Sequence, residues 1–323
     1  MKISQWKKNF DEKKIFSKIK LAIKKKSLSE GKFTREFELK ISKFFNTKHV
    51  VAVPSGTTSL LISLLAIDLK KNDEVIIQNR GWISAYNAAK LLDLKVKFVD
   101  VEKDRPVLNM EDLKRTVTRK TKAIIVIHMG GRICNMRDLL SFAKKRKIKI
   151  IEDAAQAFGS KYKKQFAGTF GDIGCFSMSI AKTISSGQGG FVITNKKKIY
   201  NNLTKLKNNG LNNIKEIYKW GIGGLNFKFS DILAAIALID FDKFQFYKKK
   251  QIQNYLLYLK KLDHLKEIKI IPVYVSKGEI PQYVEILLKK RDGLYKYMKK
   301  NHIDCRIFYP NLSKATRNKL TKK

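Results

Sequence analysis

From residue 49 to residue 153 the sequence alternates short apolar runs with stretches of helical period, and this alternation restricts the fold more than any other feature. The runs are "HVVAVPS", "DEVIIQ", "KVKFVDV", "KAIIVIH" and "KIKIIED", with stretches such as "MRDLLSFAKKR" between them. Continuous apolar runs of this length are typical of strands buried on both faces. Repeated strand and helix units imply a mostly parallel sheet covered by helices. The sequence therefore predicts an α/β fold.

The pattern changes after residue 153. Shorter strands are predicted at "IGCFSMS" and "GGFVITN", followed by helices over 196–210 and 230–250. Beyond residue 250 we expect a strand, a helix and a strand at "YVEILLK", "DGLYKYMKKN" and "IDCRIFYP". Because 323 residues suit one large domain and one small one, we expect three parts: a helical arm over 1–30, a large α/β domain over 31–249 and a small α+β domain over 250–323.

The chain is strongly basic, with 68 Lys and Arg against 28 Asp and Glu and a net charge of +40. Such a charge on its own suggests a nucleic acid or another anionic partner. The basic residues are mostly Lys and are spread along the whole chain, whereas base readout favours Arg. We therefore expect a solvated basic surface and no specific nucleic-acid binding. A non-catalytic protein that binds nucleic acid remains the alternative from another class.

Cysteine usage and hydropathy place further limits on the protein. Cys134, Cys175 and Cys305 are far apart and include no C-x-x-C pair, so neither a disulfide framework nor a metal site is expected. No apolar run reaches the roughly twenty residues that span a bilayer, because "SLLISLLAI" ends at Asp68. The N-terminus is charged and unlike a signal peptide. A cytoplasmic protein without a membrane partner is expected.

One lysine stands alone in apolar sequence. Between Lys164 and Lys196, the stretch "CFSMSIAKTISSGQGGFVITN" contains Lys182 as its only basic residue. Buried ammonium groups are rare without a use. The structural alternative is a lysine near a domain edge that either extends its charge into water or forms a salt bridge.

Polar and small residues follow the predicted strands. In open α/β sheets ligands bind beyond the carboxyl ends of strands. Small residues that can approach an anion follow "VVAVP" at 55–58. An acidic stretch with Asp153 and Gln156 follows "KIKII", Trp82 follows "DEVIIQ", and Ser177 ends a later strand. Taken singly, each has a structural explanation as a helix cap or a packing residue.

Taken together, these residues suit pyridoxal 5'-phosphate (PLP). A lysine forms its Schiff base, an acidic or Arg partner tunes its pyridine nitrogen, and small residues bind its phosphate. Burial should lower the pKa of Lys182 and supply the neutral amine that attacks a carbonyl. Lys182 and Asp153 are therefore the leading candidates for chemistry.

At this point four stretches resemble a known family. "PSGTTSLLISLLA", "IIEDAAQAFGS", "GDIGCFSMSIAKTISSGQGGFVITN" and "GLNFKFSDILAAIAL" are similar, in this order, to the DegT/DnrJ/EryC1/StrS sugar aminotransferases. The resemblance runs from about residue 30 to residue 312, and the lysine stretch is similar to that of perosamine-synthase-like members. It implies a fold-type I PLP enzyme that works as a homodimer. Such an enzyme moves an amino group, usually from glutamate, onto a nucleotide-linked keto-sugar for polysaccharide biosynthesis such as that of O-antigen.

The resemblance also implies residue roles. Lys182 matches the Schiff-base lysine and proton shuttle, and Asp153 matches the partner of the pyridine nitrogen. Gln156 matches a residue that contacts the ring or its hydroxyl, and Trp82 the aromatic ring that stacks on the cofactor. The remaining cofactor-binding positions are Gly56, Thr57, Thr58 and Ser177 at the phosphate, and Asn226, which the family contributes across the dimer interface to the neighbouring subunit's phosphate.

Three departures from the family pattern bear on function. Gln188 replaces the usual Glu of "GEGG", "KNNG" at 207–210 lacks a common histidine, and the chain ends soon after "IFYPNL". We expect a small domain that is naturally short or truncated. The alternatives within the family are a sugar dehydratase, a cyclitol aminotransferase and a member that binds cofactor without turnover. A lysine at position 182 argues against dehydratases that carry histidine there.

Overall fold

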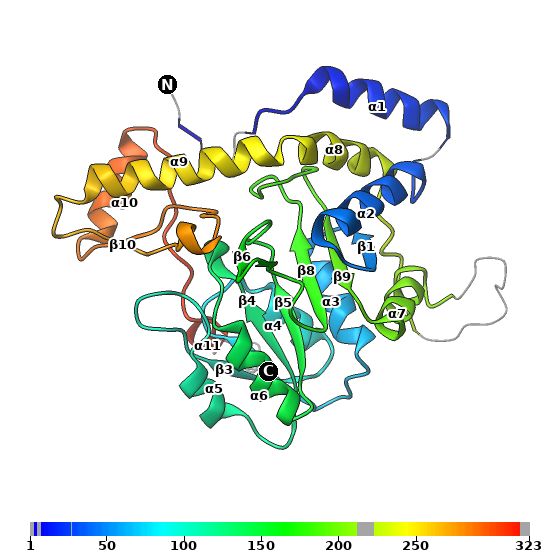
Figure 1. Ribbon diagram of the computed structural model, residues 1–323, viewed down its shortest axis with the longest axis horizontal. Coiled ribbons are helices and arrows are strands. Elements are labelled where there is room, and N and C mark those ends of the chain that lie inside the picture. Colours follow the sequence, from blue (N-terminus) through cyan, green and yellow to red (C-terminus); the bar gives the residue numbers. More distant parts are fainter. Residues whose placement is uncertain (1–2, 5–7, 27, 212–222, 317–323) are drawn as a thin grey trace, which may run out of the picture.

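The structure is a computed structural model that describes residues 3–4, 8–26, 28–211 and 223–316. Its centre is a seven-stranded sheet (Figure 1). In spatial order the strands are β1 (His49–Val53), β9 (Gly190–Thr194), β8 (Ile173–Ser177), β5 (Lys149–Asp153), β4 (Thr121–Ile127), β2 (Glu74–Gln78) and β3 (Lys95–Val99). Only β9 runs antiparallel to its neighbours; the other pairs are parallel. The prediction of a mostly parallel α/β fold is confirmed.

Helices cover both faces of this sheet because alternate strand residues point to opposite sides. Val50 and Ala52 of β1 belong to one buried core, whereas Val51 and Val53 belong to the other. The first core is closed by α2 (Lys32–Phe45), α5 (Met110–Thr116), α6 (Met136–Lys145) and α8 (Asp231–Asp242). The second is closed by α3 (Gly56–Ala66), α4 (Ser84–Leu91) and α7 (Lys197–Lys207). The result is a three-layer sandwich.

Local sequence explains where these helices begin. Ser55 caps α3 by accepting from the Thr58 N–H, and Asn135 caps α6 through the Asp138 N–H. α2 begins after Gly31, which has no side chain to serve as a cap. The buried carboxylate of Asp231 takes over and accepts from three N–H groups of that turn, those of Gly31, Phe33 and Thr34. This distant cap ties the start of α2 to α8.

The remaining elements are short or lie at the two ends of the chain. The helices are α1 (Glu12–Lys24), α9 (Phe244–Leu262), α10 (Arg291–Lys300), α11 (Leu312–Ala315) and the 3-10 turns η1 (Met129–Gly131) and η2 (Val275–Lys277). Two small antiparallel ladders pair β6 (Lys161–Tyr162) with β7 (Gln165–Phe166), and β10 (Lys269–Ile270) with β11 (Ile286–Leu287). The three-part division expected from the sequence stays a prediction, and its boundary at residue 249 falls within α9.

Several expected elements differ from the structure. The helix expected over 230–250 is two helices, because α8 ends at Asp242 and α9 continues from Phe244 to Leu262. The strand expected at "YVEILLK" is limited to β11. The strand expected at "IDCRIFYP" is wrong: residues 303–310 contain no strand. Ile303, its first residue, and Asn311, which follows it, make isolated bridges to Ile3 and Arg80, and among the described residues no ladder lies beside the segment for it to extend.

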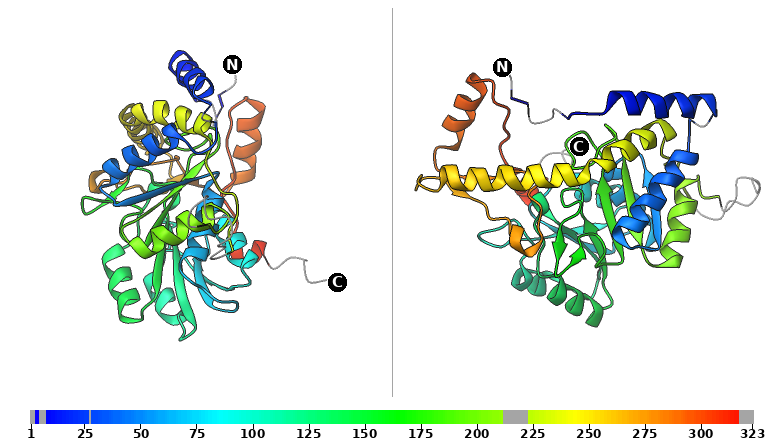
Figure 2. Two further views of the ribbon diagram at one scale, coloured as in Figure 1. Left: turned by 90° about the vertical axis from the view of Figure 1, so that its right-hand side faces the viewer. Right: turned by 45° about the horizontal axis from the view of Figure 1, so that its top comes forward.

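The first residues of the chain lie beside its last third. Ile3 bridges to Ile303, its N–H donating to the His302 carbonyl over 3.0 Å. From there the chain reaches α1, which packs against α8. Figure 2 shows α1 lying along the same side of the molecule as α8 and α9. The N-terminal arm therefore borders both the sheet's helical cover and the C-terminal region.

Candidate active site

The sheet direction brings the candidate residues to one edge. β1, β8, β5, β4 and β2 point the same way, so their carboxyl ends meet at one side of the sheet. Asp153 is the last residue of β5, Ser177 the last of β8, and Gly56 begins α3 shortly after β1. β8 lies next to β5 and is separated from β1 only by β9. Three segments far apart in sequence are thereby neighbours in space.

The start of α3 and the end of β8 form the candidate phosphate site. Gly56 faces Ser177 so closely that a side chain has no room there. The Thr57 hydroxyl is 2.8 Å from the Ser84 hydroxyl, and Thr58 donates its N–H to Ser55 over 3.0 Å. The first N–H groups of a helix carry a partial positive charge that favours an anion. This end of α3 is suited to a phosphate group.

Two adjacent carboxylates at the end of β5 have different roles. Glu152 is fully buried and accepts from the N–H groups of Gly168, Phe170 and Gly171 at 2.6–2.7 Å. It also contacts the His128 Nε2 at 2.8 Å, so its oxygens are committed to structure. The carboxylate left for chemistry is that of Asp153.

Asp153 is buried with little compensation for its charge. The residue is 7% exposed, and one carboxylate oxygen accepts from the Ala155 N–H over 3.1 Å. Burial raises the pKa of Asp153, and the Ala155 N–H, Lys182 and His128 counter this only in part. A cationic N–H donor placed at this carboxylate would restore its ionised form.

Lys182 belongs to the loop between β8 and β9. Its N–H donates to the Ser179 carbonyl over 3.0 Å. Burial lowers the pKa of its amine, Asp153 opposes that shift, and Arg306 adds to it. The amine is thus moved toward its neutral form, in which it can attack a carbonyl carbon. The charges of Lys182 and Asp153 each act on the pKa of the other group, as expected of two candidates at the same edge of the sheet.

Gln282 fixes the backbone around Lys182 and was not predicted from the sequence. Its amide nitrogen donates to the Ala181 carbonyl over 2.9 Å, and its amide oxygen accepts from the Thr183 hydroxyl over 2.8 Å. Its own N–H donates to the Gly130 carbonyl. The Gly130 N–H in turn donates to the side-chain oxygen of Gln156 over 3.0 Å. A chain of hydrogen bonds thus connects Gln156 to the loop of Lys182.

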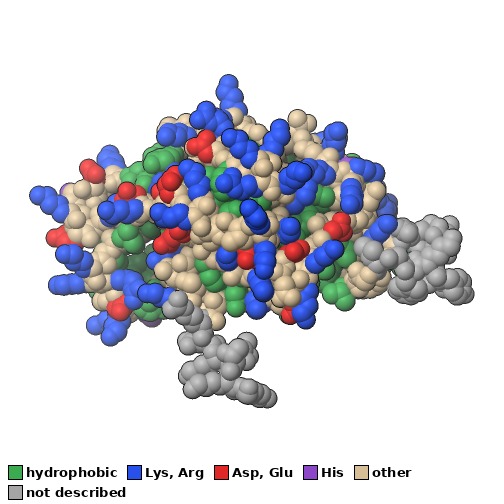
Figure 3. All heavy atoms as spheres, turned by 90° about the horizontal axis from the view of Figure 1, so that it is seen from below, with side chains coloured by type: hydrophobic (Ala, Val, Ile, Leu, Met, Phe, Trp, Pro, Cys, Tyr) green, Lys and Arg blue, Asp and Glu red, His purple; other side chains and the backbone are tan. Residues whose placement is uncertain are grey.

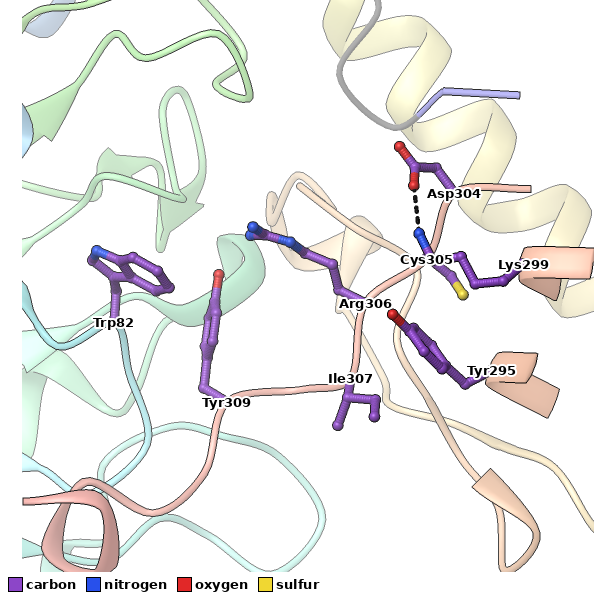
Figure 4. A pocket seen from close by; sticks show the side chains of 8 residues that line it. All are labelled: Trp82, Tyr295, Lys299, Asp304, Cys305, Arg306, Ile307 and Tyr309. Atoms are coloured by element: carbon purple, nitrogen blue, oxygen red, sulfur yellow. Dashed lines mark hydrogen bonds and ion pairs between the residues drawn. The ribbon is translucent and has the colours of Figure 1, made fainter. Parts of the chain in front are cut away.

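A cavity of about 450 Å³ opens beside Trp82 (Figure 4). Its lining residues are Trp82, Tyr295, Lys299, Asp304, Cys305, Arg306, Ile307 and Tyr309. Trp82 is half exposed and meets Tyr309 edge to face at 5.4 Å between ring centroids. Arg306, one of these lining residues, also lowers the pKa of Lys182. Arg306 and Tyr309 lie in the segment expected to be a strand, which explains why the sequence did not single them out.

A model of the DegT/DnrJ/EryC1/StrS aminotransferase family matches residues 9–322. The chain belongs to this family. The GDP-perosamine synthase of Escherichia coli O157:H7 is 33% identical over 290 residues, which cover 87% of this chain and 78% of that protein. The GDP-4-keto-6-deoxy-D-mannose 3-dehydratase of E. coli O55:H7 is 26% identical over 302 residues, covering 86% and 77%.

Solved structures agree with this family assignment. An E. coli GDP-4-keto-6-deoxy-D-mannose-3-dehydratase with bound hydrated PLP superposes with a TM-score of 0.89 at 25% identity, covering 96% of this chain and 86% of that one. This DegT/DnrJ/EryC1/StrS protein is therefore a PLP-dependent aminotransferase of fold type I. The alternative of a non-catalytic nucleic-acid-binding protein is set aside.

The candidate site fits PLP on structural grounds. Asp153 is a buried acid that needs a cationic partner, which a protonated pyridine nitrogen provides. Gly56 leaves open the helix end that the phosphate requires. Lys182 has an amine whose pKa is already lowered. Trp82 offers an exposed ring beside the cavity. The cofactor supplies an aldehyde carbon that accepts an amino group from one substrate and passes it to another.

Asn226 and Gln188 are both exposed. Asn226 is exposed, bridges to Asn208 after α7, and accepts from the Lys228 N–H. Gln188 is exposed on the loop after Lys182, and its carbonyl accepts from the Ser186 hydroxyl over 2.6 Å. Within the described part of a single chain, Asn226 forms no hydrogen bond with Lys182 or Asp153. Its role across a dimer interface stays a prediction.

Three further features of the described residues are the surface charge, the candidate metal ligands and the hydropathy of the helices. Figure 3 shows Lys and Arg side chains spread over the visible face with Asp and Glu between them, and no continuous basic stripe. In the part of the chain that the structure describes, no cluster of His, Cys, Asp or Glu could hold a metal ion. No helix among the described residues is both long and apolar enough to cross a bilayer.

Proposed function

We propose that this enzyme transfers the amino group of glutamate to the keto carbon of a GDP-linked keto-sugar. The observation that carries the proposal is that the charges of Lys182 and Asp153 act on each other: Lys182 is a partly buried amine with a lowered pKa, and Asp153 is a buried acid with a raised one. Transamination needs both, because one group must move a proton at carbon while the other keeps the ring electron-withdrawing. The name of the GDP-perosamine synthase relative supports a guanosine diphosphate sugar as the acceptor.

In this proposal each residue has one task. Lys182 Nζ attaches the cofactor covalently between turnovers and carries the proton between donor and acceptor carbons. Asp153 pairs with the pyridine nitrogen, Trp82 stacks on the ring, and Gln156 orients the ring or its hydroxyl. The phosphate is bound by Gly56, Thr57, Thr58 and Ser177, and by Asn226 from a second subunit of a homodimer.

The cavity beside Trp82 suits the sugar nucleotide. Arg306 and Lys299 line it and offer cationic groups toward a diphosphate, while Tyr295 and Tyr309 offer aromatic surface. Lys299 pairs with Asp304 over 2.8 Å, which partly neutralises its charge. The surplus positive charge of the chain adds long-range attraction that weakens as salt is raised.

The product is an amino sugar for surface polysaccharide such as O-antigen, made by an enzyme of the cytoplasm. A sugar dehydratase of the same family is the competing reaction, since one relative carries that name. In this proposal, the lysine at position 182 favours amination over dehydration. The amine of Lys182 can return a proton to the sugar carbon and complete amination, whereas loss of water requires no such return by a lysine.

The deciding experiment incubates the PLP-loaded enzyme with GDP-4-keto-6-deoxymannose and glutamate, and records the mass of the sugar product together with 2-oxoglutarate. We expect an amino sugar and 2-oxoglutarate in equal amounts, with ping-pong kinetics. A product that has lost water would identify the dehydratase. No change in the sugar alongside 2-oxoglutarate formation would show that this sugar is not the substrate. The Lys182→Ala variant controls for reaction without the enzyme's lysine.

A further inference from the structure

The N-terminal segment touches the loop that carries Lys182. Lys8 Nζ donates to the carbonyl of Lys182 over 3.1 Å and to that of Thr183 over 3.0 Å. It also forms an ion pair with Asp240. The side chain of Lys8 is 9% exposed and that of Asp240 is fully buried. All three donors of the ammonium group are thus used inside the protein.

Asp240 bonds to a second point on the loop between β8 and β9, residues 178–189, which we call the lysine loop. One of its oxygens accepts from the Ser185 N–H over 2.7 Å, and the other accepts from the Tyr247 hydroxyl over 2.8 Å. Lys8 Nζ also lies 4.7 Å from the centre of the Tyr247 ring. Two carbonyls and one N–H within residues 182–185 are therefore bonded to a single buried ion pair.

A buried ion pair of this kind contributes little net stability, because the loss of hydration offsets the attraction. Burial lowers the pKa of Lys8, and Asp240 opposes that shift. The pair instead fixes the backbone of residues 182–185, because its donors and acceptors are satisfied in one arrangement of this loop. The arrangement bears directly on the position of the Lys182 backbone.

We propose that Lys8 is a positioning residue for catalysis: held by Asp240, it fixes the carbonyls of Lys182 and Thr183 and so keeps the amine of Lys182 beside Asp153. This inference rests on the proposed function. It gives the N-terminal arm a role in catalysis. That role follows neither from the residues at the ends of the strands nor from the names of the relatives. Removal of the contact should loosen the lysine loop and leave the rest of the sheet in place.

The first measurement is amide hydrogen exchange of residues 179–189 in the cofactor-free, full-length protein. We expect Lys8→Met to accelerate exchange at Ser185 by roughly tenfold or more, because a charge-assisted hydrogen-bond network is lost. Lys8→Arg should restore much of the protection, since a guanidinium also offers several donors. The matched control is Lys18→Met in α1, which removes an ion pair between Lys18 and Glu36 at 3.0 Å on the same arm.

A second variant separates positioning from the cost of an unpaired charge. Lys8→Met leaves the Asp240 carboxylate buried without its partner, whereas Lys8→Met/Asp240→Asn keeps an acceptor for the Ser185 N–H and removes the charge. We expect the double variant to retain fast exchange in the lysine loop. Exchange that returns to the wild-type rate in the double variant would overturn the proposal.

The PLP-loaded enzyme gives the second readout. Lys8→Met should lose bound PLP faster than wild type and should shift the pH at which its visible absorbance band changes, whereas Lys18→Met should match wild type in both. Wild-type values for Lys8→Met would count against a positioning role. A wild-type protein that takes up no PLP would overturn the proposed function instead, and the exchange of the Ser185 amide would still decide whether Lys8 holds the loop.

Discussion

Gly56 and Ser177 lie so close that a Cβ placed on Gly56 would be 2.7 Å from the Cβ of Ser177. The contact joins the first residue of α3 to the last residue of β8. Real Cβ atoms do not approach so closely, so a larger residue at position 56 must push these two elements apart. The candidate phosphate site lies between them and should be sensitive to this separation.

Gly56→Ala should therefore weaken PLP retention and lower the free energy of unfolding by about 1–3 kcal/mol, as overpacking does in tight sites. Urea unfolding and dialysis of the PLP-loaded protein measure the two effects. Gly293→Ala in α10 is the control, because a Cβ there meets nothing within 4 Å. It should leave PLP retention unchanged and keep or raise stability. Equal losses in both variants would show that the close contact is not the cause.

Lys182→Met should stabilise the cofactor-free protein at pH 7 by about 0.5–2 kcal/mol, the range for relieving a costly functional group. The sign follows from the lowered pKa of Lys182: the charged amine is less favourable in the folded chain than in the unfolded one. This cost is complete below the folded pKa and disappears as the pH rises to 10.5, the ordinary lysine value. The gain in the variant should fade over the same interval.

Urea unfolding at several pH values measures this difference. Lys289→Met changes an exposed lysine and should stay within about 0.5 kcal/mol of wild type at every pH. A loss of stability in Lys182→Met at pH 7 would mean that the attraction of Asp153 outweighs burial, contrary to the lowered pKa.

Asp153→Asn should keep the fold and bind PLP, but reduce turnover by about 10²–10³-fold. The amide oxygen can still accept from the Ala155 N–H, whereas a neutral side chain cannot stabilise a protonated pyridine nitrogen. The rate of 2-oxoglutarate release from glutamate alone isolates this step from sugar binding. Asp172→Asn, at a residue that precedes β8 and pairs with Lys196, should leave the rate unchanged. A normal rate in Asp153→Asn would refute the role of Asp153.

Arg132→Met should destabilise the protein by about 3–5 kcal/mol, because it leaves the nearly buried Glu285 carboxylate without its partner. Arg132 is fully buried and also donates to the carbonyls of Pro272 and Ile271 at 2.9 and 3.0 Å. It thereby fastens the C-terminal region to the turn after β4. Calorimetry or urea unfolding should show the loss, and Arg137→Met at an exposed ion pair should show almost none.

The same pair predicts a pH dependence. Burial raises the pKa of Glu285, and Arg132 opposes that shift. Without Arg132 the pKa of Glu285 rises further, so the variant can take up a proton and relieve the unpaired charge. The stability difference between Arg132→Met and wild type should shrink as the pH falls. A difference that grows on acidification would contradict this account.

The sheet and the residues at its edge could be predicted because the sequence patterns that indicate them are short and continuous along the chain. Each parallel strand is a continuous apolar run, and Gly56, Asp153 and Ser177 each follow or end one, so topology alone brings them together. β3 fits the pattern less well, since Lys95 is exposed at the open edge of the sheet. That exposure reflects the strand's place in the sheet, which its own sequence does not encode.

The remaining site residues depend on long-range packing. Lys8 is one of 68 basic residues and differs from the others only through its burial against Asp240. Gln282 reaches the lysine loop from a segment of irregular structure. Arg306 does carry a signal, as an arginine within the apolar stretch "IDCRIFYP". The role of Arg306 was missed because the segment was expected to be a strand. An alternating strand pattern does not indicate that a side chain lines a cavity.

The order of strands also governs how a growing chain can fold on the ribosome. β1 is made first, yet its only partner in the sheet is β9, with His49 paired to Thr194. Until β9 has been synthesised, β1 has no strand with which to pair, and the anion-binding end of α3 cannot meet β8. The two sides of the candidate phosphate site can therefore meet only after residue 194 has been made, and a translational pause before that residue would leave an apolar strand unpaired and open to chaperones.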